Sequence, residues 1–255
     1  MENKEKLGPS QGQSPDFSTL SEMPAFVASK QDSIDTLIGL GYEADDARNI
    51  TLAYGVSDLK DSTLSNNIGR NFVFLQELGY SQDDVIKMTK SLPSIYNLSI
   101  ENMRQKISDM QELGYSQDDV IKMTKLLPSI YSYSIENMRQ KISDMQELGY
   151  SQDDVIKMTK LLPNIYGYSI ENMRQKINFY DSINMHDLAI IDAKQLMQGT
   201  ALSYARYQFL SREKQIDINI NNYRLLFLVQ AQFKKRYGYS NDEIKQKYPY
   251  GEGEQ

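Results

Sequence analysis

The feature that most constrains the fold of this chain is an internal repeat. The sequence GYSQDDVIKMTK occurs three times, starting at Gly79, Gly114 and Gly149, so that the copies lie 35 residues apart. A proline follows each copy at the same interval: Pro93, Pro128 and Pro163. A fixed period between about 20 and 50 residues is typical of solenoids, in which stacked copies of one supersecondary unit bury a shared core. The repeat therefore predicts a solenoid.

One unit, residues 79–113, carries the signals of two helices. Ser81 and the two aspartates that follow it predict a capped helix start, and Pro93 ends that helix because proline cannot continue a helix interior. Ser99 predicts a second cap, before apolar residues at helical spacing. Gly114 predicts the end of this longer helix, because glycine readily adopts positive φ. The apolar stripe of the longer helix is Ile100, Met103, Ile107, Met110 and Leu113.

Degenerate copies extend the array in both directions. Leu40-Gly41-Tyr42 matches the start of the later units, residues 188–197 predict a further first helix, and residues 202–210 predict a further second helix. The fold class predicted is therefore all-α, a right-handed-type α-solenoid of about five to six short-helix/long-helix repeats. We expect a disordered tail at 1–30, a repeat domain at 31–249 with units near 33–78, 79–113, 114–148, 149–183 and 184–220 and a C-terminal cap at 221–249, and a short tail at 250–255.

Composition excludes several classes of protein. The 255 residues include no cysteine, which excludes disulfides, thiolate metal sites and a cysteine nucleophile. No apolar run approaches the roughly 18 to 20 residues of a membrane span. The net charge of −6 argues against strong nucleic-acid affinity, but residues 203–248 hold nine Lys and Arg against four Asp and Glu. This polarity suits the orientation of a polyanion.

The first residues, MENKEKLGPSQGQSPDF, have neither the apolar region of a signal peptide nor the Arg-rich character of a transit peptide. We therefore expect a protein of a bacterial cytoplasm, or one exported into a host cell.

Two segments resemble one known family. The succession LGYSQDDVIKMTKLLPSIYSYSIENMRQKI is similar to the repeat of the mitochondrial transcription termination factor (mTERF) family, and FKKRYGYSNDEIKQKYP at 233–249 resembles the closing segment of that family. The resemblance covers roughly residues 33–249. It implies a superhelix whose positively charged concave surface holds nucleic acid through its phosphates. It also implies a role in transcription, its termination, or RNA metabolism.

Basic residues recur at equivalent places in each unit, and stacking would align them into ladders about 8–10 Å apart. A phosphate backbone that followed such a ladder would bind with salt-sensitive affinity. Helix two also repeats Lys106, Lys141 and Lys176. The predicted nucleic-acid-binding residues are Lys87, Lys90, Arg104, Lys122, Lys125, Arg139, Lys157, Lys160, Arg174, Arg206, Lys234, Lys235 and Arg236.

The residues by themselves leave a second interpretation open. Pairs such as Asp83 with Lys87, or Glu101 with Arg104, are typical of solvated helix surface. The unit 79–113 has four basic and five acidic residues, a net charge of −1. On this interpretation the chain is a protein-interaction scaffold, for example a bacterial effector, that binds no nucleic acid.

The three copies differ mainly in the turn between their helices, including Asn97, Ser132 and Gly167. These positions either read individual bases or have drifted, as turns tolerate. Tyr96 and its equivalents Tyr131 and Tyr166 either fill the core between repeats or offer stacking platforms.

His186 has no second histidine at metal-ligand spacing, and no nucleophile–base pair is apparent. We expect a monomeric, non-enzymatic protein without a cofactor or metal. Its predicted partner is nucleic acid, double-stranded DNA in preference to RNA, and not a membrane.

Overall fold

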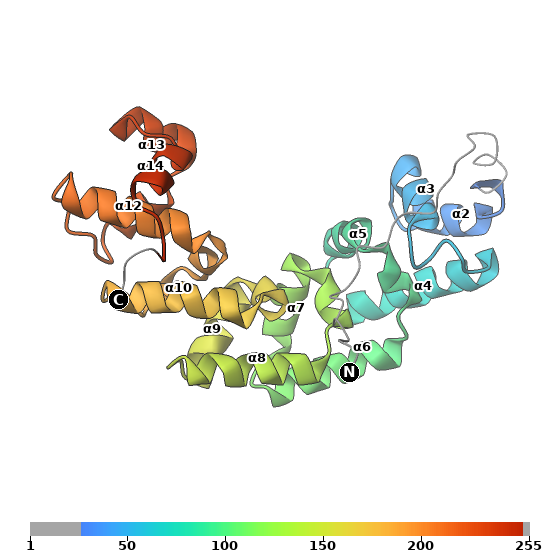
Figure 1. The fold of residues 1–255 in the computed structure, drawn as a ribbon. Coiled ribbons are helices and arrows are strands. Elements are labelled where there is room, and N and C mark those ends of the chain that lie inside the picture. The colour runs from blue at the N-terminus through green and yellow to red at the C-terminus, as the bar shows by residue number, and fades with distance from the viewer. Residues whose placement is uncertain (1–26, 252–255) are drawn as a thin grey trace, which may run out of the picture. The chain divides into compact units, whose positions relative to one another are not determined.

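Each identical repeat folds into a short helix, a 3₁₀ turn and a long helix (Figure 1). The structure is a computed structural model that describes residues 27–251. These residues contain no strand, and the fold is an all-helical α-solenoid. The central elements are α5 (Gln82–Ser91), η1 (Pro93–Asn97), α6 (Ile100–Glu112), α7 (Gln117–Leu126), η2 (Pro128–Ser132), α8 (Ile135–Glu147), α9 (Gln152–Leu161), η3 (Pro163–Gly167) and α10 (Ile170–Ser182).

The helix boundaries predicted from the capping signals are confirmed. The Ser81 hydroxyl accepts from the Asp84 amide, while the Asp84 carboxylate accepts from the Ser81 amide, which completes a capping box at the start of α5. Ser99 caps α6 through the Asn102 amide. Leu92, the residue before Pro93, leaves the helical region with φ of −139° and ψ of 78°, because a following proline disfavours helical backbone, and α5 ends there.

Each long helix ends at a residue with positive φ, which marks the repeat boundary. Gly79 has φ of 106°, and the amide of Tyr80 after it donates to the Leu75 carbonyl, the six-residue closure of a Schellman motif. Asn184 (55°) and Gln215 (53°) take this place after α10 and after the next long helix. The period therefore continues after the glycines stop. The positive-φ glycines at the other boundaries are Gly41, Gly114, Gly149 and Gly238.

Additional helices lie on both sides of the identical repeats. The helices before them are α2 (Gln31–Gly39), α3 (Ala44–Leu52) and α4 (Asp61–Glu77). The elements after them are α11 (Leu188–Ile191), η4 (Ala193–Met197), α12 (Thr200–Arg212), η5 (Tyr223–Phe227), α13 (Gln230–Tyr237) and α14 (Asn241–Lys247). The second helix predicted at 202–210 lies within α12. The tails predicted at 1–30 and 250–255 fall mostly on residues 1–26 and 252–255, which lie outside the described residues.

The first helix predicted at 188–197 requires a correction. Only Leu188–Ile191 is α-helical, and Ala193–Met197 is a 3₁₀ turn. Asp192 between them has φ of −144° and ψ of 74°, close to the backbone of Leu162 before η3. This repeat therefore keeps the turn although alanine replaces the proline, because the backbone of the preceding residue still breaks the helix.

Contacts divide the chain into two compact units, Met1–Tyr133 and Ser134–Gln255. In the first unit α3 contacts α5, α5 contacts α7, and α2 packs on α4. In the second unit α9 contacts α11, while α10 contacts both α8 and α12, and α12 contacts α14. No helix among residues 27–251 has the length and apolar content that a membrane span requires.

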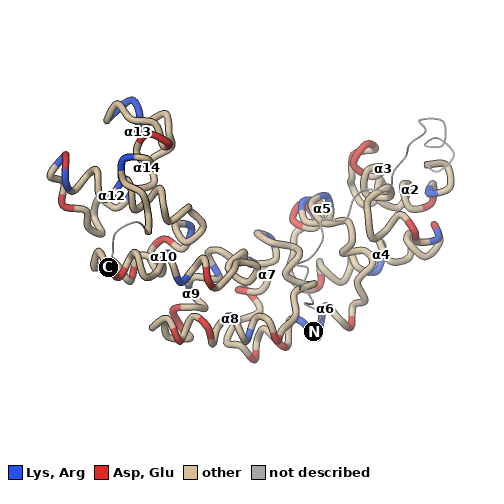
Figure 2. Tube along the Cα trace, in the orientation of Figure 1, with Lys and Arg blue, Asp and Glu red and all other residues tan. Residues whose placement is uncertain are grey.

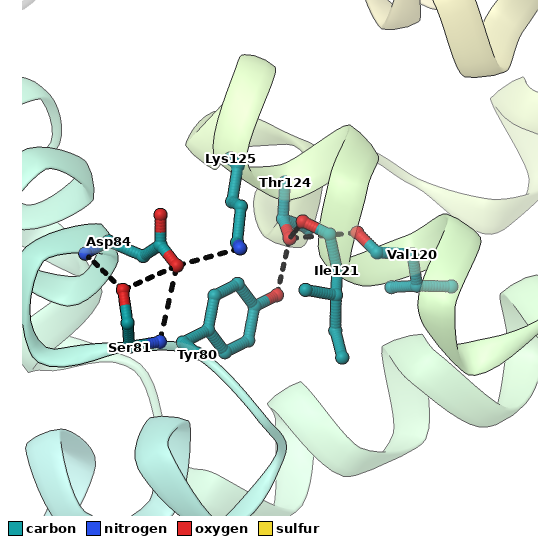
Figure 3. Close-up of polar contacts among 7 residues, drawn as sticks. All are labelled: Tyr80, Ser81, Asp84, Val120, Ile121, Thr124 and Lys125. Carbon is teal, nitrogen blue, oxygen red and sulfur yellow. Dashed lines mark hydrogen bonds and ion pairs between the residues drawn. The ribbon is translucent and has the colours of Figure 1, made fainter.

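A buried hydroxyl cluster joins successive repeats in the first unit. The Tyr80 hydroxyl, after α4, bonds to the Thr124 hydroxyl of α7 (Figure 3) and lies 3.0 Å from the Tyr131 hydroxyl of η2. One repeat earlier, the Tyr42 hydroxyl lies 2.6 Å from both the Thr89 and the Tyr96 hydroxyl. Burial raises the pKa of Tyr80 and Tyr42, so both phenols stay protonated. Each cluster therefore connects the tyrosine at the start of one repeat to the short helix and the turn of the following repeat.

We predict that Tyr80→Phe lowers the free energy of unfolding by about 1–2 kcal/mol, because it leaves the buried Tyr131 hydroxyl without this partner. Urea denaturation followed by circular dichroism measures the change. Tyr54→Phe is the matched control, since this ring is 64% exposed and its variant should differ from wild type by less than about 0.5 kcal/mol. Equal stability of the two variants would contradict a stabilising role for the cluster.

Candidate nucleic-acid interface

The first row of predicted cations lies on the exposed side of the short helices. Lys87 of α5 and Lys122 of α7 are exposed, and neither makes an ion pair within the part of the chain that the structure describes. Lys157 of α9 is also exposed, but its Nζ lies 3.1 Å from Asp154 on the same helix. Of the three equivalent lysines, two are therefore available to an external anion.

The second row on the short helices is paired with acids of the preceding repeat. Lys125 Nζ lies 2.7 Å from Asp84 Oδ2 (Figure 3), and Lys90 Nζ lies 2.6 Å from Asp46 Oδ2. The hydrogen bond from Lys125, with those from Ser81, lowers the pKa of Asp84 to about 2. One aspartate therefore both caps the start of α5 and compensates a lysine of the next repeat. Lys90 and Lys125 are therefore largely neutralised.

The predicted arginines of the long helices are placed differently from one another. Arg104 of α6 is exposed, and its guanidinium lies 4.7 Å from the centre of the Phe74 ring, at a cation–π distance. Arg139 of α8 is exposed, whereas Arg174 of α10 is half-buried. Lys160 at the end of α9 is also half-buried.

One position of the long helices bonds inward to the next 3₁₀ turn. Asn71 Nδ2 of α4 donates to the carbonyl oxygens of Ile95 (2.9 Å) and Leu98 (3.0 Å) at η1. Lys106, 35 residues later, donates to the Tyr133 carbonyl that follows η2. In the second unit Lys141 Nζ donates to the Tyr168 carbonyl that follows η3, at 2.6 Å. This row therefore joins repeats and does not form the outward ladder that the sequence suggested.

Arg206, predicted to bind nucleic acid, occupies the same inward position. It is 1% exposed, and its Nη1 donates to the carbonyls of Leu226 (2.9 Å) and Leu228 (2.6 Å) around η5. Its Nη2 donates to Asn241 Oδ1 at 2.7 Å. Because these bonds bury the guanidinium, Arg206 is not part of an exposed phosphate-binding surface.

Lys176, one repeat before Arg206, is fully buried. Its Nζ donates to the Ser203 hydroxyl at 3.0 Å, and burial lowers its pKa to about 7. Burial also lowers the pKa of Lys141. The inward position therefore holds cations that the protein itself has partly desolvated.

The predicted cluster at the C-terminal end is exposed. Lys234, Lys235 and Arg236 occupy the last turn of α13 and are drawn blue in Figure 2. Within residues 27–251 no ion pair compensates them, although they are favourably placed at the negative end of the helix. We call these three residues the α13 basic cluster. Its three cations are adjacent along the chain, and Lys234 also interacts electrostatically with Glu243 of α14.

The variable turn positions Asn97, Ser132 and Gly167 are exposed at the ends of η1, η2 and η3. The residue after each contributes a main-chain carbonyl, for example Tyr133 to Lys106. Because the main-chain carbonyl is present whatever the side chain, this turn tolerates substitution without loss of the hydrogen bond between repeats. The tyrosines of the turn are core residues: Tyr96, Tyr131 and Tyr166 are at most 7% exposed. They are not stacking platforms for bases.

His186 lies between an aromatic ring and a carboxylate. Its ring stacks on Tyr150 with centroids 4.4 Å apart, and its Nδ1 lies 2.6 Å from Asp181 Oδ1. No group of three or more metal-ligating side chains occurs in the described part of the chain.

Sequence reasoning missed the inward row, although the sequence contains a signal for it. Counted from the residue that precedes each long helix, Arg206 falls in the register of Lys106, Lys141 and Lys176. A cation that recurs in register with the apolar stripe of its helix, as Lys106 does between Met103 and Met110, faces the neighbouring repeat. The closing segment also repeats earlier chemistry, since Ser240 and Glu243 form a capping box at α14 like that of Ser81 and Asp84.

The family model mTERF matches residues 17–188 of the chain. The match includes all three identical repeats and ends before α12. A search of curated protein sequences finds no significant match.

We predict that Lys176→Met stabilises the protein at neutral and lower pH, because wild type then buries a charged amine. Between pH 7 and the ordinary lysine pKa of 10.5, the unfolded chain binds a proton that the folded chain has lost, so wild-type stability rises with pH. The difference in the free energy of unfolding between Lys176→Met and wild type should therefore narrow, as the pH rises, by up to about 1.4 kcal/mol per pH unit.

Urea denaturation at a series of pH values from about 6 to 9.5 measures this difference. Lys122→Met, which removes a lysine from an exposed position, is the control. A pH-independent difference for Lys176→Met would contradict the lowered pKa.

Proposed function

Because the chain belongs to the mTERF family, a family of helical-repeat proteins associated with nucleic-acid binding, we propose that it binds nucleic acid through phosphate groups. The proposed ligand is double-stranded DNA, and the proposed role is in transcription, its termination, or RNA metabolism. The protein acts in this proposal as a monomer, without a cofactor and without a catalytic step.

The observation that carries the proposal is the α13 basic cluster. Three adjacent cations are exposed and make no ion pair among the described residues, and the segment 203–248 around them has an excess of basic residues. Lys and Arg that replace counterions at phosphates give an affinity that does not depend on base sequence and falls with salt. We propose that this cluster holds one end of the nucleic acid.

The exposed lysines of the short helices extend the proposed surface. Lys87 and Lys122 recur at the repeat interval and lack ion pairs within residues 27–251. Lys90 and Lys125 contribute less in this proposal, because Asp46 and Asp84 already compensate their charge. Arg206 is left out, since its guanidinium is buried. The remaining cations of the proposed surface are Arg104, Arg139, Lys157, Lys160 and Arg174. Asn97, Ser132 and Gly167 are the exposed turn positions that would contact bases.

A protein-binding scaffold is the second candidate, and the exposed apolar residues favour it. Leu126 ends α7, Leu161 ends α9 and Ile191 ends α11, and these side chains are 64%, 60% and 53% exposed. An apolar side chain exposed at one recurring position suits a protein partner better than a phosphate backbone. A scaffold of this kind would show no salt-dependent binding of nucleic acid.

We predict that replacing Lys234, Lys235 and Arg236 with glutamine weakens binding to duplex DNA. If all three contact phosphates, the plot of log affinity against log salt should become shallower by about 2–3. Fluorescence anisotropy with duplex DNA, single-stranded DNA and RNA over a salt series measures both effects and ranks the three ligands.

The control is the triple variant Gln76→Glu, Gln111→Glu and Gln146→Glu, which makes the same change of net charge at exposed positions of α4, α6 and α8. It should keep nearly the wild-type salt slope. Equal effects of the two triple variants would remove the α13 basic cluster from the proposal, and wild-type protein that binds no nucleic acid at low salt would refute the proposal as a whole.

A further inference from the structure

The starts of two helices and a 3₁₀ turn line one cavity in the C-terminal unit. The cavity has a volume of about 250 Å³ and lies among the start of α12, the turn η5 and the start of α13. Gln198, Gly199, Val229 and Gln230 line it and are exposed, so the cavity opens to solvent. Ser203 and Arg206 line it as buried residues.

Arg206 brings an uncompensated positive charge to this cavity. Its hydrogen-bond acceptors are neutral: the carbonyls of Leu226 and Leu228 and the amide oxygen of Asn241. Its Nε–H is buried and has no hydrogen-bond partner among the described residues. A buried charge without a counter-charge is unfavourable, and an unused buried donor adds to that cost.

A second buried cation lies behind Ser203. Lys176 is fully buried, and its Nζ donates to the Ser203 hydroxyl at 3.0 Å. Within the described residues no carboxylate pairs with it, and no aspartate or glutamate is among the residues that line the cavity. Arg206 is therefore the one charged residue in the cavity lining, and Lys176 lies next to Ser203 with a pKa that burial lowers to about 7.

Two of the helices that begin at the cavity lack a side-chain cap. Gly199 precedes α12 and Val229 precedes α13, and neither residue has a side-chain acceptor for the amides of the first turn. By contrast, the equivalent Ser99 and Ser169 cap their helices. The third helix at the cavity, α14, begins with Asn241 in the cavity lining and is capped by Ser240. The first amides of a helix point out of its start, where the helix dipole attracts negative charge.

We propose that this cavity is a binding site for a single phosphoryl group, held by Arg206 and by the amides that begin α12 and α13. A tetrahedral dianion matches this arrangement, because it accepts hydrogen bonds from several directions and compensates the buried guanidinium. The phosphoryl group is either free phosphate or the terminal phosphate of a nucleic-acid strand. The site is separate from the proposed α13 basic cluster and binds phosphate whether or not the chain binds duplex DNA.

Gly199 offers a test that keeps the protein folded. A Cβ at this position meets no atom within 4 Å, and φ is −62°, so other residues fit. Gly199→Asp places a carboxylate at the start of α12, where it caps the helix and repels an incoming anion. Gly199→Asn has nearly the same shape and the same capping ability without the charge.

Isothermal titration calorimetry with inorganic phosphate, at constant ionic strength, compares wild type with both variants. Wild type and Gly199→Asn should bind, and Gly199→Asp should bind at least about tenfold more weakly. Circular dichroism should show that both variants are folded. Absence of binding to wild type at up to ~10 mM phosphate, or equal binding by the two variants, would overturn the proposal.

Two oligonucleotides distinguish the sources of the phosphoryl group. A strand with a 5′-phosphate should bind more tightly than the same strand with a 5′-hydroxyl, by a margin that Gly199→Asp removes, if the strand terminus is the ligand. If inorganic phosphate binds and the two strands bind alike, free phosphate is the ligand. Val229→Asp and Val229→Asn repeat the comparison at the start of α13, and equal phosphate binding by these two variants would exclude that helix from the site.

Discussion

The long helices α4, α6, α8 and α12 each reach the next repeat through one inward-facing polar side chain that donates to main-chain oxygens around the following 3₁₀ turn. Lys106 and Lys141 make one such bond, and Asn71 and Arg206 each make two. Lys176 of α10 donates instead to the Ser203 hydroxyl. The main-chain bond satisfies carbonyls that a short 3₁₀ turn leaves open, and it fixes the turn against the preceding helix. The stacking of repeats depends on this bond. It also explains why the turn tolerates substitution and which cations are left exposed.

The hydrogen bonds and ion pairs between repeats reduce the number of Lys and Arg residues that are available to a ligand. A count of Lys and Arg treats every cation as available, but the structure assigns some to the turns and others to aspartates of the preceding repeat, such as Asp84 with Lys125. Asp84 also caps the start of α5, so one carboxylate of the repeat both stabilises a helix and neutralises part of the repeat surface. The cations that stay uncompensated are concentrated where the repeat becomes irregular, on α13.

The irregular C-terminal repeats also differ in how their helices begin. Serine caps the long helices α6, α8 and α10, whereas Gly199 and Val229 leave the starts of α12 and α13 without a side-chain acceptor. In the same place Arg206 replaces lysine at the inward position and has no carboxylate partner among the described residues. The uncapped amides and the guanidinium without a counter-charge thus occur at the same cavity. An anion bound there accepts hydrogen bonds from the amides and compensates the charge of the guanidinium.

The sequence by itself determined the class of fold, the helix boundaries of the identical repeats and the family. Capping serines, prolines and glycines act within a few residues, so Ser81, Pro93 and Gly114 reveal their roles without a structure. Only the tertiary structure decided which cations face solvent. Lys87 and Lys106 are both lysines of the same repeat. Lys87 lies on an exposed helix face, whereas Lys106 donates to a carbonyl of the next repeat. The true length of α11 and the cavity beside Arg206 also came only from the structure, because both depend on how turns and helix starts from separate repeats pack together.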